Sequence, residues 1–377
     1  MAAARELTLD RESFLARYWQ TAPLYMPGAV PSFVPPVDPD ELAGLAMEED
    51  VESRIVECDR GQWRQYHGPF DADDFKRSAP WTLLVQAVDH HIPEVAALRQ
   101  LVDFIPAWRM DDVMVSYAVD GGSVGPHYDN YDVFLLQGSG KRLWRLGQYC
   151  EPDAALLPHE ELRILDAFEC EEEYLLSPGD ILYVPPGRAH WGIAEGECTT
   201  FSLGFRAPRI NDMVSRWADQ LLEQLEPEQF YRDARRETVT RPGEITRRDI
   251  ERAEAQLQAA LDQASGDTWF GELVTEPREH VAPDDDDLAE ARASLHEGVS
   301  ALELSPDAKL AWQHHADGVS VFANGECLDC EDSVLPAIMG LCEYWRLDGD
   351  ELDAALGDPA SMRLFDALLE RGCVYVP

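Results

Sequence analysis

Short runs in which hydrophobic and polar residues alternate dominate the first 208 residues. The runs are rich in β-branched and aromatic residues, and each ends at a turn containing glycine, proline or serine. Several short strands at regular spacing predict an all-β domain, for which a double-sheet jelly roll of the cupin type is the natural candidate. The predicted strands lie in 113–119 (VMVSYAV), 132–137 (DVFLLQ), 142–147 (RLWRLG), 172–192 (EEYLLSPGDILYVPPGRAHWG) and 198–207 (CTTFSLGFRA).

The period of the pattern changes after residue 208. Apolar residues recur at three-and-four spacing in 213–225 and 247–264, which predicts two amphipathic helices. The acidic run from Asp284 to Asp287 indicates an exposed linker or a helix start, and the remainder mixes helices with a hairpin whose turn is Asn324-Gly325. We therefore predict three regions: 1–208, 209–275 and 276–377.

Charge narrows the possible partners. The 377 residues include 31 basic and 72 acidic ones, a net charge of −41, which excludes a protein held on nucleic acid by its overall charge and argues against an anionic membrane. Lysine occurs only at Lys76, Lys141 and Lys309, and sparse lysine with abundant Asp and Glu is typical of proteins kept soluble in concentrated salt. Attraction of a basic partner is the alternative explanation.

The lack of a spanning segment and of a signal peptide predicts a cytoplasmic protein. No apolar run approaches the roughly 18–20 residues of a spanning helix. The N-terminal sequence MAAARELTLDRESF lacks the apolar core of a signal peptide. The eight cysteines include one close pair, Cys327 and Cys330, which lacks the second half of a zinc site, so we expect ordinary thiols.

Three of the chain's histidines begin the pattern His-x-Asp or His-x-Glu. A non-haem Fe(II) oxygenase needs two imidazoles and one carboxylate on one face of an octahedron, commonly as His-x-Asp on one strand and a distant histidine on another. His315-Ala316-Asp317 has no histidine after it, and His159-Glu160-Glu161 reads as a loop or short helix. His127-Tyr128-Asp129 adjoins a predicted strand and is followed by His190 after the Pro185-Pro186-Gly187 turn, so we predict an iron site at His127, Asp129 and His190. The other histidines, including His280, are expected to be surface or capped residues.

Arg142 is the candidate for binding the cosubstrate. Oxygenases of this kind commonly use 2-oxoglutarate, and the planar fork of an arginine suits its distal carboxylate. Arg142 begins the strand after the one that follows His-x-Asp, although a surface arginine is the alternative. Ser116 could donate a second hydrogen bond, or could face solvent.

The segments GGSVGPHYDNYDVFLLQGSGKRLWRLG, YLLSPGDILYVPPGRAHWG and FSLGFRAP closely resemble the bacterial JmjC-type ribosomal oxygenases, above all those that hydroxylate an arginine of a large-subunit ribosomal protein. The opening FLARYWQTAPLYMPGAV is similar to the N-terminal segment of that family. The resemblance implies an α+β multidomain protein: a JmjC-type double-stranded β-helix over 1–208, a helical dimerisation region over 209–275 and a winged-helix-like domain over 276–377.

The same resemblance implies residue roles and a reaction. His127, Asp129 and His190 would hold Fe(II), while Arg142 and Ser116 would bind 2-oxoglutarate and Met114 would line its pocket. The reaction would hydroxylate the β-carbon of an arginine in a basic ribosomal protein, releasing succinate and CO2, and the enzyme would be a homodimer that does not contact DNA. The alternatives are a histidine hydroxylase, a small-molecule 2-oxoglutarate oxygenase, and a cupin-like binding protein with a degenerate metal centre.

Four residues close to the triad could receive a guanidinium group, which needs an acidic or aromatic partner. For the two aspartates, the capping of turns is the favoured alternative, so none of the four is assigned to the site. The residues are Asp120, Tyr128, Tyr131 and Asp132.

Overall fold

The computed structural model describes residues 7–238, 240–263, 266, 268–277 and 283–377. Met1–Glu6 and His280, on which expectations were placed above, lie outside the described residues. The chain divides into two units, Met1–Ala207 and Pro208–Pro377. No described helix combines the length and apolarity needed to cross a bilayer.

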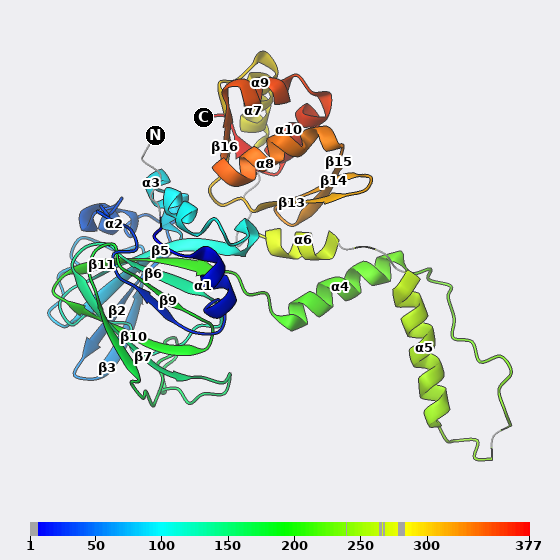
Figure 1. Cartoon of the computed structure of the whole chain (residues 1–377), viewed down its shortest axis with the longest axis horizontal. Coiled ribbons are helices and arrows are strands. Elements are labelled where there is room, and N and C mark those ends of the chain that lie inside the picture. The colour runs from blue at the N-terminus through cyan, green and yellow to red at the C-terminus, as the bar shows by residue number, and fades with distance from the viewer. Residues whose placement is uncertain (1–6, 239, 264–265, 267, 278–282) are drawn as a thin grey trace. The chain divides into compact units, whose positions relative to one another are not determined.

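Two antiparallel sheets facing each other form the first unit (Figure 1). The larger sheet has eight strands in the order β1-β9-β6-β11-β5-β4-β2-β3, and the smaller has the order β10-β7-β8. The strands are β1 (Leu24–Met26), β2 (Ser53–Asp59), β3 (Gln62–His67), β4 (Trp81–Val85), β5 (Met110–Ala118), β6 (Val133–Gln137), β7 (Lys141–Tyr149), β8 (Glu172–Leu176), β9 (Ile181–Val184), β10 (Arg188–Glu195) and β11 (Cys198–Phe205). The predicted strands and the jelly-roll architecture are confirmed.

The two faces of the large sheet pack against different partners. On β5, Val113 and Val115 join a core with α1 (Arg11–Arg17), α2 (Pro39–Leu45) and α3 (Pro93–Ala96) on the outer face. Leu135 and Val184 face the other way, where they pack against Trp144 and Leu146 of the small sheet. Successive side chains of a strand point to opposite faces. The residues of β5 that alternate with Val113 and Val115 therefore line the barrel interior.

Two amphipathic helices follow the barrel: α4 (Ile210–Gln224) and α5 (Arg247–Gln263), close to the predicted bounds. Many of their apolar side chains are exposed, although Leu221 on α4 is buried. The exposed set comprises Ile210, Val214, Trp217, Leu222, Ile250 and Leu257.

The C-terminal part has its own core, to which residues of four described helices and two small sheets contribute. The Asn324-Gly325 turn joins two strands as predicted, with both residues at positive φ (47° and 85°) as a type I′ turn requires. The acidic run beginning at Asp284 caps a helix, because the Asp284 side chain accepts hydrogen bonds from two backbone amides. The elements are α6 (Thr268–Thr275), α7 (Asp285–Glu297), β12 (Ala301–Leu304), β13 (Leu310–His315), β14 (Gly318–Ala323), β15 (Glu326–Cys330), α8 (Leu335–Tyr344), β16 (Arg346–Asp348), α9 (Gly349–Leu356), α10 (Pro359–Glu370) and β17 (Val374–Tyr375).

Candidate active site

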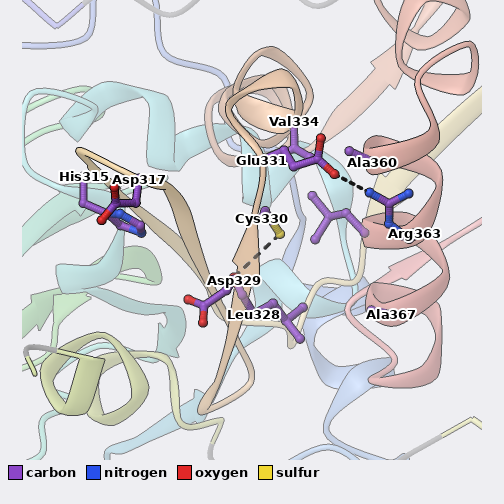
Figure 2. A pocket seen from close by; sticks show the side chains of 11 residues that line it. His315, Asp317, Leu328, Asp329, Cys330, Glu331, Val334, Ala360, Arg363 and Ala367 are labelled. Carbon is purple, nitrogen blue, oxygen red and sulfur yellow. Dashed lines mark hydrogen bonds and ion pairs between the residues drawn. The ribbon is translucent and has the colours of Figure 1, made fainter.

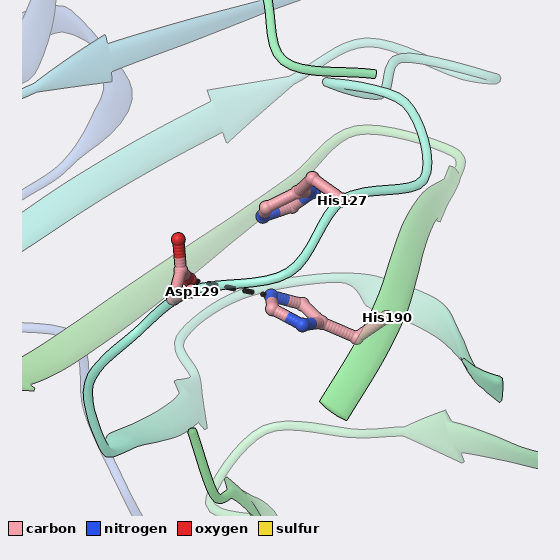
Figure 3. Close-up of side chains that lie close together, drawn as sticks. All are labelled: His127, Asp129 and His190. Carbon is pink, nitrogen blue, oxygen red and sulfur yellow. Dashed lines mark ion pairs between the residues drawn. The ribbon is translucent and has the colours of Figure 1, made fainter. Parts of the chain in front are cut away.

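Three side chains from two segments that are distant in sequence converge at one end of the barrel. His127 and Asp129 lie on the segment between β5 and β6, and His190 lies on β10 (Figure 3). One ligand atom from each of the three residues lies within 4.8 Å of the others, and the described residues contain no other such group. The His190 Nε2 and Asp129 Oδ2 atoms are 3.6 Å apart. The structure therefore brings together the three residues predicted to hold iron.

Backbone hydrogen bonds hold the two histidines beside each other. His127 and His190 form an isolated antiparallel bridge, in which each amide donates to the other's carbonyl at 3.0 and 2.8 Å. The Pro185-Pro186-Gly187 turn adds a bond from the Gly187 amide to the Asp129 carbonyl at 2.7 Å. Gly187 has a φ of +76°, which glycine adopts without strain. The turn thus attaches the Asp129 segment directly to the strand that carries His190.

A side-chain bond connects the same two segments. The Trp191 indole Nε1 donates to the Ser123 hydroxyl at 2.8 Å, and that hydroxyl also accepts the Gly125 amide at 3.0 Å. Ser123 is buried. Sequence reasoning did not identify this pair, although both residues lie inside the two recognised motifs.

Hydrogen bonds at Nδ1 leave the Nε2 atom of each histidine for a metal. The Nδ1 of His127 lies 2.9 Å from the Gly125 carbonyl oxygen, and that of His190 lies 3.0 Å from the Arg188 carbonyl oxygen. A carbonyl can only accept, so each Nδ1 carries a proton and Nε2 is the ring nitrogen left to bind a metal. Burial, reinforced by the neighbouring His127, lowers the pKa of His190 to about 4. The imidazole is therefore neutral near pH 7, the state in which it binds metal.

The histidines of the other two His-x-acid segments have local hydrogen-bond partners. The Nδ1 of His159 accepts the amides of Glu161 and Leu162, and Glu161 pairs with His67 at 3.2 Å. His315 ends β13 in the C-terminal part, where its Nε2 lies 3.3 Å from the Ser320 hydroxyl. Both segments are explained by local hydrogen bonding.

Arg142 is buried inside the barrel, so the surface alternative is wrong. Its side chain is 5% exposed, and its Nη1 donates to the Ser116 hydroxyl, itself buried, at 3.2 Å. The Arg142 Nε and Nη2 atoms have no hydrogen-bond partner among the described residues. An uncompensated buried cation is strongly unfavourable, so this position suits an anionic ligand that supplies the missing acceptors.

Buried polar residues beside Ser116 extend this pocket. Thr200 on β11 is in register with both Ser116 and Gln137, and Ser202 is in register with the half-buried Met114. Sequence reasoning missed Gln137, Thr200 and Ser202. The signal was available, because Thr200 and Ser202 alternate with Phe201 and Leu203 in CTTFSLGF.

The four possible guanidinium partners separate into two groups. Asp132 is fully buried and accepts hydrogen bonds from Arg109, Gln20 and Tyr183, so it is structural. Asp120 accepts the Gly196 amide at 2.8 Å and caps a turn, as favoured above.

The two tyrosines lie on the segment that carries Asp129. Tyr131 is 41% exposed, and the adjacent Asp129 carboxylate, together with burial, raises its pKa. Tyr128 donates to the Glu151 carbonyl at 3.3 Å. Tyr131 therefore keeps its proton and leaves part of its ring open to a substrate.

The donor set fits a ferrous ion and a dicarboxylate. Two imidazoles and one carboxylate form the facial set typical of non-haem Fe(II) oxygenases. The buried cation of Arg142 supplies the partner for a distant carboxylate, and the Trp144 ring lies between the two groups, 5.9 Å from the His190 ring and 5.8 Å from the Arg142 guanidinium carbon.

Comparison with known protein families gives three matches. Residues 97–213 match the JmjC domain, residues 256–375 match the ROXA-like winged helix, and residues 169–278 match the AraC-like ligand binding domain. The fold is thus a JmjC cupin-like barrel with a winged-helix domain.

Curated relatives match over nearly the whole chain. The ribosomal protein uL16 3-hydroxylase of Escherichia coli is 36% identical over 97% of this chain and 98% of its own length. A protein of Haemophilus influenzae named as a probable ribosomal oxygenase is 33% identical over 97% of this chain and 94% of its own.

Solved structures show the same architecture. Escherichia coli YcfD superposes with a TM-score of 0.85 at 34% identity, covering 99% of this chain and 100% of that one. YcfD in complex with cobalt and 2-oxoglutarate gives a TM-score of 0.83 at 34% identity, covering 98% of this chain and 99% of that one.

Proposed function

The chain belongs to the JmjC-type ribosomal oxygenases, and from this premise we propose that it is an Fe(II)- and 2-oxoglutarate-dependent hydroxylase of an arginine in a large-subunit ribosomal protein. The observation that carries the proposal is the convergence of His127, Asp129 and His190 in the same barrel as a buried Arg142 that lacks acceptors. One group suits a metal, and the other suits a carboxylate. The cupin-like binding protein with a degenerate centre is disfavoured, because both groups are intact.

His127, Asp129 and His190 would hold the ferrous ion. The two carbonyl contacts at Nδ1 fix the orientation of the rings, and the His127–His190 bridge limits how far the ligands can separate. Because burial lowers the pKa of His190, that imidazole need lose no proton near pH 7 when a metal binds.

Arg142 and Ser116 bind the distal carboxylate of 2-oxoglutarate. The free Nε and Nη2 groups of Arg142 can donate to the two carboxylate oxygens, while Ser116 orients the guanidinium. Met114, which is in register with Ser202, borders the same interior space. These contacts orient the cosubstrate and exclude water from it.

The bound iron and 2-oxoglutarate supply the oxidising chemistry: one atom of O2 enters a C–H bond of the substrate as hydroxyl, and the other enters succinate as CO2 is released. The protein contributes orientation and exclusion of water. The proposed target is the β-carbon of the arginine, as in the 3-hydroxylase relative's name. A guanidinium substrate is compatible with the strongly acidic chain, with its net charge of −41.

Mass spectrometry tests the substrate. The full-length chain, supplied with Fe(II), ascorbate and 2-oxoglutarate, is incubated with the large-subunit ribosomal protein uL16 and with peptides from it. We expect succinate release and one added oxygen at the β-carbon of a single arginine. A matched peptide with lysine at that position should remain unmodified. Oxygen on a histidine would contradict the arginine proposal but not the iron centre, and turnover of a free metabolite alone would contradict both protein-substrate proposals.

The region after the barrel is proposed to form the dimer interface. Support comes from Ile210, Val214 and Trp217 on α4, which are spaced by four and three residues and are 72%, 54% and 37% exposed. Apolar residues in such a stripe commonly mark a helix-packing surface.

We further propose a cytoplasmic location, where ribosomal proteins are made. We also propose that the chain has three regions, 1–208, 209–275 and 276–377.

A further inference from the structure

A groove lies between β15 and α10 in the C-terminal part (Figure 2). Its cavity volume is about 580 Å³, and all its lining residues belong to the second unit. Leu328, Val334 and Leu364 line its floor, where Leu328 is half-buried and Val334 and Leu364 are 0% and 3% exposed. Asp317, Asp329 and Glu331 contribute carboxylates. The groove therefore joins an apolar floor to an acidic rim, a combination that no step of the proposed hydroxylation uses.

One wall of the groove is an edge strand. The sheet has the order β13-β14-β15, and β15 pairs with β14 alone among the described strands. An exposed edge can accept an extended peptide as an added strand, with main-chain hydrogen bonds giving affinity and side-chain pockets giving specificity. Helix α10 contacts β15 and contributes Leu364 and Ala367 to the lining. The groove thus has the layout of a peptide site rather than a closed pocket for a small molecule.

The rim selects for positive charge. Asp317 and Asp329 are exposed and belong to no ion pair of the described residues, although Asp329 accepts the Ser320 hydroxyl at 3.3 Å. Glu331 pairs with Arg363 at 2.6 Å, but these side chains are 70% and 66% exposed. An exposed pair contributes little, so an incoming arginine or lysine can replace Arg363 as the partner of Glu331. The same carboxylates repel a polyanion.

We propose that this groove binds an extended basic segment of the ribosomal-protein substrate, outside the barrel site. The proposal rests on the proposed function for the identity of the partner. The aliphatic stems of arginine and lysine would lie against the half-buried Leu328 and Ala367 while their charged ends meet the rim. The substrate would then be held at two places, and the affinity for the whole protein would exceed that of a short peptide around the target arginine.

Fluorescence anisotropy with the full-length chain tests the groove. Labelled synthetic peptides that together span uL16, with the target arginine replaced by lysine, report binding without turnover. We expect at least one basic peptide whose dissociation constant rises about fivefold in Asp329→Asn/Glu331→Gln at low salt. The control is Glu343→Gln/Asp353→Asn, an equal charge change on α8 and α9 at exposed positions away from the groove, which should leave the affinity within about twofold.

A second variant separates shape from charge. Ala367→Trp fills the groove without changing any charge, and it should weaken the same peptide about fivefold or more. Thermal melting verifies that each variant is folded. If Ala367→Trp does not fold, the result for Asp329→Asn/Glu331→Gln tests the proposal by itself. In turnover assays the groove variants should raise KM for the whole ribosomal protein, while kcat and the KM for the short target peptide stay unchanged.

Three results would overturn the groove proposal: no peptide that binds, equal loss in the Glu343/Asp353 control, or an unchanged KM for the whole protein. A wild-type enzyme that hydroxylates no arginine, but whose peptide binding still depends on the groove, would instead refute the proposed function and leave the groove site standing.

Discussion

The barrel interior and helix α4 depart from the usual partition of residues in opposite directions. Inside the barrel, Arg142 and Ser116 are polar groups removed from water, and two nitrogens of Arg142 have no acceptor in the described chain. On α4, Ile210 and Val214 are apolar groups that remain in water, at 72% and 54% exposed. Each arrangement is unfavourable for an isolated chain and becomes favourable when something binds.

The difference indicates what kind of partner each region requires. A buried cation beside three metal-ligand groups leaves space only for small, anionic or metallic ligands. A stripe of exposed apolar side chains along a helix requires another protein surface. The four predictions below test this contrast, beginning with the largest expected effect.

Removing a metal ligand should have the largest effect. We expect His127→Ala or Asp129→Ala to reduce succinate release by more than about 1000-fold, because two remaining ligands cannot hold and orient the ion. The measurement is single-turnover hydroxylation followed by mass spectrometry. Asp120→Ala, which changes an aspartate that caps a turn, is the matched control. Unaltered turnover in either ligand variant would exclude this triad.

Removing the buried cation should act on the cosubstrate. Hydrogen bonds to a charged group are worth about 1.5–3 kcal/mol, so Arg142→Ala should raise the apparent KM for 2-oxoglutarate about 10- to 100-fold. Arg142→Lys keeps the charge but loses the planar fork. Its KM for 2-oxoglutarate should therefore lie between those of the wild type and Arg142→Ala. If KM is unchanged in Arg142→Ala, another residue binds the distal carboxylate.

Breaking the link between Ser123 and Trp191 should have a smaller effect. Ser123→Ala removes the acceptor of the Trp191 indole and loosens the His127 segment, so we expect metal affinity to fall about tenfold. Titration with Co(II), followed by absorption and calorimetry, measures this directly. Ser177→Ala, the same change in the turn between β8 and β9, should not alter the affinity. Equal affinities in both variants would show that the backbone bridge alone positions His127.

Changing the exposed stripe should leave the chemistry intact. Trp217→Asp should convert a dimer into a species near 42.4 kDa by light scattering, because a carboxylate is poorly tolerated in an apolar interface. Hydroxylation of a short peptide should be unaffected. Trp312 on β13 is also 37% exposed, so Trp312→Asp is the matched control and should remain dimeric. Wild-type protein that is itself a monomer would refute the interface.

Local pattern was sufficient for most of the barrel and for the recognition of the triad. Alternation and turn residues located β5 to β9 and β11, since each strand's period and its Pro-Gly or Gly-Ser-Gly ends are encoded within a few residues. His-x-Asp and the Pro-Pro-Gly turn were likewise readable, because i and i+2 on an extended segment share a face. The burial of Arg142 could not be predicted from the local pattern, which was equally compatible with a surface arginine.

Local sequence pattern identified most of the barrel strands, both amphipathic helices and the residues that could bind iron, but not β1 to β4. The folded chain was needed to show that His127 bonds to His190, that Trp191 donates to Ser123, and that Arg142 lies inside with unused donors. The physical reason is range: periodicity and turn chemistry act over a few residues, whereas burial and hydrogen bonding between distant segments depend on how the sheets close on each other.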